Sequence, residues 1–105
     1  MAQSLANLQA KIKAERARRG FVTDPLKIFT LLNEEVGEMA AELKKTWSKN
    51  YDQFDVHKLE EEIADSFIVL VALANSFDID LEAAVVDKFF EKDSHRAWKS
   101  AQSSK

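Results

Sequence analysis

Two short acidic motifs contain the residues whose types and spacing are best suited to chemistry. The first reads Glu34-Glu35-Val-Gly-Glu38, and the second reads Glu62-Ile-Ala-Asp65. Carboxylates three or four positions apart on a helix lie about 5–6 Å from one another at Cβ and repel. After Glu34 the next lysine is Lys44, so a divalent cation is a natural source of the missing positive charge. A set of carboxylate oxygens suits Mg²⁺, with Mn²⁺ as a substitute.

Helical spacing indicates how the two motifs could meet. At about 100° per residue, one stripe of the first helix is apolar and a neighbouring arc is acidic. The stripe holds Ile28, Leu32, Val36, Met39 and Leu43, and the arc holds Glu34, Glu35, Glu38 and Glu42. On the later helix, Glu62 and Asp65 border a stripe made of Leu59, Ile63, Ser66 and Leu70. If the stripes pack antiparallel, the acidic edges converge at a half-buried position; the alternative is that each pair faces solvent on its own helix.

Helix start and stop signals define the first half of the chain. Ser4 can cap a first helix, and Gly20 can end it. Asp24 followed by Pro25 is a strong start signal for a second helix, which should run to about residue 45 or 46. Residues 47–54 break the periodicity and form the main loop. The aromatic side chains of this loop could stack on a planar ligand or fold back onto the core.

Two more helices complete an all-α fold. Asp55 can cap a third helix near residues 56–77, and Asp80 can cap a fourth from residue 81 to about 99. We expect Leu81, Val85 and Phe89 of the fourth helix to face inward. The third helix is apolar on every side from residue 67 to 74, more than so small a domain can bury alone. Obligate dimerisation is therefore predicted.

Composition narrows the class of protein. The 105 residues form one domain, expected over residues 1–99, followed by a flexible polar tail over 100–105. The net charge of −3 argues against binding to nucleic acid polymers. The longest apolar run is too short to span a membrane, and no signal peptide is visible. With no cysteine in the sequence, a reducing, cytoplasmic location is expected.

The acidic motifs resemble those of the MazG-like nucleoside triphosphate pyrophosphohydrolases, members of an all-α superfamily. The pattern of that family is E-E-x-x-E, a spacer of variable length, and then E-x-x-D. In this chain residues 39–61 separate the two motifs, and Ile79-Asp80-Leu81-Glu82 opens the last helix in wording close to that of the family. The likeness covers residues 25–96. It implies a four-helix MazG-like bundle completed by dimerisation, as a dimer or as a tetramer built from two dimers.

The resemblance also implies an activity and a role for each acidic residue. The expected reaction is Mg²⁺-dependent hydrolysis of a (deoxy)nucleoside triphosphate to the monophosphate and pyrophosphate, as part of nucleotide-pool house-cleaning. Glu35, Glu38, Glu62 and Asp65 would be the metal ligands. Glu34 would orient or deprotonate the attacking water, a catalytic role that Glu38 could share.

Substrate phosphates need cations beyond the metal, and the last helix of the family carries them. Lys88, Lys92 and Arg96 stand at such positions here, although Asp93 replaces the asparagine common in the family. The alternative for these three cations is a solvated helix face. Trp47 is a candidate for stacking on the base, without ranking above Tyr51, Phe54 and Trp98.

Other interpretations are excluded or stay open. A ferritin-like di-iron site needs E-x-x-H motifs, which the chain lacks, and neither glycine lies in a P-loop. Gly37 indicates close approach of a ligand or facing helix, or tolerated packing against a bulky neighbour. The basic end of the first helix is either solvated or a phosphate contact; it comprises Lys11, Lys13, Arg16, Arg18 and Arg19. A non-enzymatic helical interaction module remains the alternative function.

Overall fold

The computed structural model of the protein describes residues 4–98, and these residues form helices without any strand. The α-helices are α1 (Leu5–Arg19), α2 (Pro25–Lys44), α3 (Val56–Asn75) and α4 (Leu81–Val85). A π-helix, η1 (Val86–Lys92), continues α4 without a break. The all-α class is therefore confirmed for the described residues. The predicted tail, residues 100–105, lies outside them.

Local capping contacts explain several of the helix boundaries, whereas Asp24 makes no side-chain hydrogen bond at the start of α2. The hydroxyl of Ser4 accepts a hydrogen bond from the N–H of Asn7, and Gly20 ends α1 at a φ of 74°. The Asp55 carboxylate accepts the N–H of His57 at 2.9 Å. These caps lie where the sequence predicted them, because each depends on side chains within a few residues.

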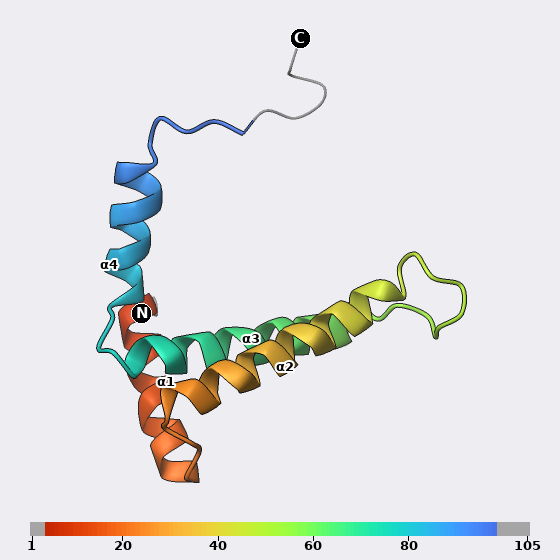
Figure 1. Cartoon of the computed structure of the whole chain (residues 1–105), viewed down its shortest axis with the longest axis horizontal. Coiled ribbons are helices and arrows are strands. Elements are labelled where there is room, and N and C mark those ends of the chain that lie inside the picture. The colour runs from red at the N-terminus through yellow and green to blue at the C-terminus, as the bar shows by residue number, and fades with distance from the viewer. Residues whose placement is uncertain (1–3, 99–105) are drawn as a thin grey trace.

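Helices α2 and α3 run antiparallel, side by side, and form the largest interface of the chain (Figure 1). We call this pair the hairpin. Its core is small and lies toward the α1 end, where Ile28 of α2 packs with Val69 and Ala72 of α3. Ile28 is only 2% exposed. The hairpin therefore sets the position of any group in the middle of α2 or α3.

Helix α1 crosses one end of the hairpin, and α4 extends away from that same end (Figure 1). Buried Gln9 joins the three elements that meet there. Its side chain donates to Asn75 and to the carbonyl of Ile79, and it accepts from the N–H of Leu81 at 3.1 Å. The described chain does not itself close a four-helix bundle, since α4 does not lie along the hairpin. Completion by a second copy stays a prediction.

The fourth helix differs from its prediction in length and in orientation. The π-helix ends at Lys92, short of the expected residue 99, which lies outside the described residues. Val85 is 46% exposed and Phe89 is 64% exposed, so the prediction that they face inward is wrong for the single chain. The physical reason is that α4 packs mainly against α1, and among residues 4–98 no further helix packs along α4 or η1.

Helix α3 is also rotated from the orientation that the sequence indicated. Glu62, Ser66, Val69 and Ala72 are buried, whereas Ile63 and Leu70 are 49% and 43% exposed. The packed face is thus shifted by one residue from the predicted stripe. Residues 67–74 are apolar on all sides, so periodicity there could not distinguish one face from the next. As a result, Glu62 lies on the packed face rather than at its border.

The loop between α2 and α3 leaves two of its aromatic side chains exposed. Trp47 is 74% exposed and Tyr51 is 51% exposed, while Phe54 is half-buried. Folding back onto the core is therefore wrong for Trp47 and Tyr51 in the single chain. The ammonium group of Lys44 lies 4.3 Å from the centre of the Tyr51 ring, a cation–π contact.

Among the described helices, none is long and apolar enough to cross a membrane.

Candidate metal centre

The hairpin brings together three of the four predicted metal ligands. Glu35 on α2 meets Glu62 and Asp65 on α3, and one carboxylate oxygen from each lies within 4.8 Å of the others. We call these three residues the acidic cluster. The alternative in which each acidic pair faces solvent on its own helix is wrong for them. Their role as ligands stays a prediction that the geometry supports.

Burial makes this cluster unfavourable without a counter-charge. Glu62 is 7% exposed, and one carboxylate oxygen each of Glu35 and Glu62 is buried without a hydrogen-bond partner. The buried hydroxyl of Ser66, one turn after Glu62, also has no partner in the described chain. Buried polar atoms normally have partners, and a buried carboxylate without one is costly. Ser66 was predicted only as part of a packing stripe, and no sequence signal marked it as a polar group beside the cluster.

The pKa values of the cluster report the same shortage of positive charge. Burial raises the pKa of Glu35, and the negative charges of Glu38, Asp65, Glu62 and Glu34 raise it further. Burial, followed by the charge of Glu38, also raises the pKa of Glu62. Each effect favours the protonated form. A divalent cation would reverse the balance by stabilising the carboxylates.

Glu38 and Glu34 lie beside the cluster rather than in it. Both are exposed on α2. The charge of Glu38 acts on both Glu35 and Glu62, whereas that of Glu34 is the weakest of those acting on Glu35. Glu38 therefore lies near the cluster without belonging to it. Glu34 stands at its edge.

Glu42 shows a different fate for a carboxylate in the same acidic arc of α2. It is 3% exposed, accepts the N–H of Asp55 at 3.0 Å, and pairs with the ammonium group of Lys45 at 3.1 Å. The Asp55 N–H, and then Lys45, lower the pKa of Glu42. With both oxygens satisfied, Glu42 fastens the end of α2 to the start of α3 and has no need of a metal.

Packing does not account for Gly37, which lies between Glu35 and Glu38. A Cβ atom built at this position would meet no atom within 4 Å. Neither a facing helix nor a bulky neighbour in the described chain therefore requires glycine there. The open space beside the backbone is compatible with the approach of a ligand, which stays a prediction.

The residues predicted to bind substrate lie apart from the acidic cluster. Lys92 pairs with Asp87 at 3.0 Å, while Lys88 and Arg96 both pair with Asp93, on a segment that extends away from the hairpin (Figure 1). Trp47 lies in the loop beyond the end of α2, at the opposite end of the hairpin from α1. Asp93, noted in the sequence as a departure from the family pattern, is the partner of two of the three cations.

Comparison with known proteins identifies the family of the chain. The model of the MazG nucleotide pyrophosphohydrolase domain family matches residues 23–99. The chain belongs to this family. The uncharacterized protein YpjD of Bacillus subtilis (strain 168) is 42% identical over 77 residues, which cover 69% of this chain and 69% of YpjD. No solved structure matches.

Membership in the MazG family confirms the resemblance identified from the acidic motifs. It points to nucleotide pyrophosphohydrolase activity in a family that generally depends on divalent metal ions. The matched residues include α2, α3 and α4, and therefore the whole acidic cluster. Helix α1 lies before the matched residues.

Proposed function

We propose that this MazG domain hydrolyses nucleoside triphosphates at the bond between the α- and β-phosphates, releasing a nucleoside monophosphate and pyrophosphate. The observation that carries the proposal is the convergence of Glu35, Glu62 and Asp65, with buried carboxylate oxygens that lack partners. Nucleotide-pool house-cleaning in the cytoplasm is the role that we propose for this reaction.

The donor set fits Mg²⁺, with Mn²⁺ as its substitute. All the donors are carboxylate oxygens, which hard divalent cations prefer, and the chain has no cysteine to favour a softer metal. Glu35, Glu62 and Asp65 would hold the ion, and Glu38 would join them. When bound, the metal would neutralise charge on the phosphates and lower the pKa of its water.

The remaining carboxylates of α2 would handle the proton of the attacking water. Glu34 is exposed at the edge of the cluster, where the attacking water can reach it. The pKa values of Glu35 and Glu62 are raised, so either group would also accept a proton more readily than an ordinary carboxylate. We assign the role of general base to Glu34, because the other carboxylates are needed as metal ligands. Glu38 could share this role.

A second copy of the chain would complete the substrate site. Lys88, Lys92 and Arg96 lie on a segment that extends away from the acidic cluster of their own chain. Large apolar side chains are also exposed along the hairpin and η1: Val36, Leu43, Ile63, Leu70, Val86, Phe89 and Phe90. We propose a dimer, or a tetramer of two dimers, in which these cations and Trp47 contact the nucleotide of a neighbouring copy.

Leu70 offers a test of this assembly. It is 43% exposed, so Leu70→Gln removes apolar surface without opening the core. We expect the sedimentation mass to fall toward that of one chain while the helical circular dichroism remains. Val71 is fully buried, and its polar replacement would test folding instead. An unchanged mass for Leu70→Gln would contradict an interface at this position.

The reaction itself is tested with a panel of canonical and damaged dNTPs, with and without Mg²⁺. We expect pyrophosphate and monophosphate only when the metal is present. Orthophosphate would mean cleavage at a different bond. No turnover of any nucleotide, together with no metal binding, would favour the helical interaction module, which the exposed apolar faces would then serve.

A further inference from the structure

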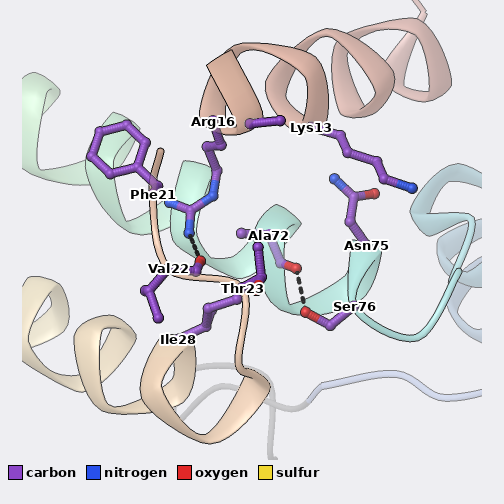
Figure 2. Close-up of a pocket in the computed structure, with 10 residues that line it drawn as sticks. Lys13, Arg16, Phe21, Val22, Thr23, Ile28, Ala72, Asn75 and Ser76 are labelled. Atoms are coloured by element: carbon purple, nitrogen blue, oxygen red, sulfur yellow. Dashed lines mark hydrogen bonds between the residues drawn. The ribbon is translucent and has the colours of Figure 1, made fainter. Parts of the chain in front are cut away.

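A second candidate site lies at the α1 end of the hairpin, away from the acidic cluster (Figure 2). A pocket of about 190 Å³ opens between the second half of α1, the connector that follows it, the first turn of α2 and the last turn of α3. The residues on which the argument depends are Lys13, Arg16, Phe21, Val22, Thr23 and Ile28. We call this space the α1 pocket.

The floor of the α1 pocket is apolar and is large enough for a ring. Val22, Ile28 and Ala72 line it, and two of these belong to the buried core cluster. A cavity of about 150 Å³ between apolar side chains is known to take up benzene. At about 190 Å³, the α1 pocket has room for a body of that size, with its open side toward solvent.

A partly buried cation lies over this floor. One guanidinium nitrogen of Arg16 donates to the carbonyl of Val22 at 2.8 Å, and the guanidinium stands 5.1 Å from the centre of the Phe21 ring. Among residues 4–98, no carboxylate forms an ion pair with Arg16. Burial lowers its pKa, because its charge is partly removed from water without a carboxylate to balance it.

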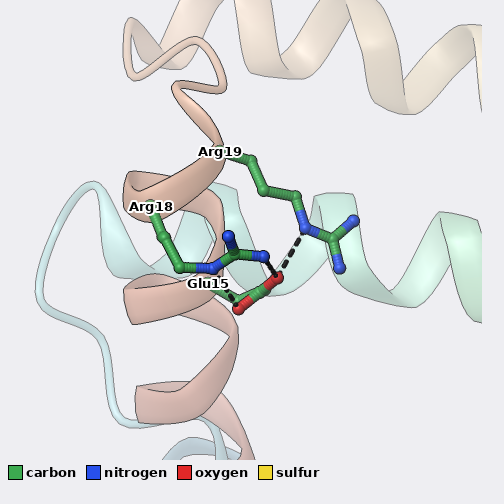
Figure 3. A network of polar contacts seen from close by, with 3 residues as sticks. All are labelled: Glu15, Arg18 and Arg19. Carbon is green, nitrogen blue, oxygen red and sulfur yellow. Dashed lines mark hydrogen bonds and ion pairs between the residues drawn. The ribbon is translucent and has the colours of Figure 1, made fainter.

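The two neighbouring arginines of α1 show what compensation looks like on the same helix. Arg18 and Arg19 both pair with Glu15 (Figure 3), and these contacts lower the pKa of Glu15 to about 2. Glu15 therefore forms its ion pairs with Arg18 and Arg19 and not with Arg16. The positive charge that faces the α1 pocket is not balanced by this network.

Further groups at the rim can meet an anion. Lys13 lines the pocket and has no ion-pair partner within residues 4–98, and Thr23 adds a hydroxyl. Ser76 already donates its hydroxyl to the carbonyl of Ala72 at 3.0 Å. Asp78 and Asp80 line an adjacent hollow that shares Lys13 and Asn75, and no carboxylate lines the α1 pocket itself.

We propose that the α1 pocket binds a small organic anion, with an apolar ring on Val22 and Ile28 and a carboxylate or phosphate group at Arg16 and Lys13. The site is distinct from the acidic cluster. Ile28 precedes Glu35 by two helical turns, which amounts to roughly 10 Å along α2. None of the residues that line the α1 pocket belongs to the acidic cluster, so the proposal does not depend on the pyrophosphohydrolase activity.

The test is a titration of the full chain, followed by amide NMR shifts, with benzoate, phenyl phosphate and neutral benzyl alcohol. We expect both anions to bind with millimolar dissociation constants and to shift the amides of Val22, Thr23 and Ser76. Benzyl alcohol should bind at least about tenfold more weakly, because it cannot use the two cations. The tighter of the two anions identifies the head group as carboxylate or phosphate.

Matched variants separate this pocket from general charge effects. Ala17→Leu fills the pocket from an exposed helical position and should abolish binding, while Ala14→Leu, on the same helix but outside the pocket, should not. Arg16→Gln should weaken both anions about tenfold and leave benzyl alcohol unchanged.

Charge variants keep the test valid if Ala17→Leu fails to fold. Lys13→Gln should then weaken anion binding severalfold, and Lys11→Gln, outside the pocket, should not. Glu62→Gln should retain anion binding even if it loses all turnover. Equal binding of the neutral probe, unchanged binding in Arg16→Gln, or shifts centred on Glu35 and Asp65 would overturn the proposal.

Discussion

The middle of the hairpin and the segment formed by α4 and η1 differ in whether their charged side chains have partners of opposite charge. In the hairpin, Glu35, Glu62 and Asp65 gather within 4.8 Å, with two carboxylate oxygens buried and unpartnered. On the other segment, each predicted phosphate-binding cation pairs with a nearby aspartate at the surface. Surface pairs contribute little to stability, whereas an uncompensated buried charge is costly. An acidic motif therefore indicates a metal site when the fold buries its carboxylates without a nearby positive charge or hydrogen-bond donor.

Neutralising one member of the acidic cluster should have the largest effect. Glu62→Gln replaces a proposed ligand with a neutral side chain of similar size. We expect turnover to fall by more than about 100-fold. Glu61→Gln is the matched control, because Glu61 is exposed and lies outside the cluster. Initial rates of pyrophosphate release in Mg²⁺ decide the matter. Near-normal activity in Glu62→Gln would break the comparison.

Glu42 should matter for stability rather than for chemistry. Glu42→Ala leaves the buried N–H of Asp55 and the ammonium group of Lys45 without their acceptor. We expect the melting temperature to fall by roughly 5–10 °C, with kcat unchanged at a temperature where the variant is folded. Thermal unfolding and rates measured together distinguish this outcome. A selective loss of kcat at an unchanged melting temperature would place Glu42 in the site.

The stability of the metal-free protein should depend on pH with a defined sign. Glu35 and Glu62 have folded-state pKa values above the ordinary value of 4.5, so the native state binds more protons than the unfolded state. The contribution of these two groups to stability must then fall as pH rises from the unfolded pKa through the raised folded values. Relative to the Glu35→Gln variant, the wild type should lose more stability over this interval in EDTA, and saturating Mg²⁺ should restore it. Parallel melting curves for the two proteins would contradict the uncompensated cluster.

Releasing the surface cations should have the smallest effect. Asp93→Asn frees Lys88 and Arg96, whose side chains are 63% and 66% exposed, and should change stability by less than about 1 kcal/mol. We expect KM for the nucleotide to fall severalfold, because the cations become available to phosphates, while kcat stays the same. Steady-state kinetics check this expectation. A higher KM would mean that Asp93 itself contributes to binding.

Sequence reasoning succeeded where structure depends on near neighbours. Ser4, Gly20 and Asp55 act as predicted, because a cap requires only the residues beside it. The acidic cluster was also predictable, since the i, i+3 spacing places Glu62 and Asp65 on one side of their helix. Its convergence with Glu35 required only that two adjacent helices pack antiparallel.

Sequence reasoning failed where a helix is apolar on every side, or where no neighbouring helix determines which face is buried. Leu70 was expected to face inward, but the apolar run over residues 67–74 does not specify which side packs. Phe89 is exposed because no neighbouring helix in the described chain covers η1. Ser66 and the α1 pocket combine residues whose proximity arises only from tertiary packing.

The most direct test of the central claim is a crystal structure grown with Mn²⁺ and examined by anomalous scattering at the manganese edge. We predict a strong anomalous peak coordinated by oxygen atoms of Glu35, Glu62 and Asp65, with Glu38 turned toward it. A well-ordered hairpin with no peak among these carboxylates, or with the only peak elsewhere on the chain, would contradict the account.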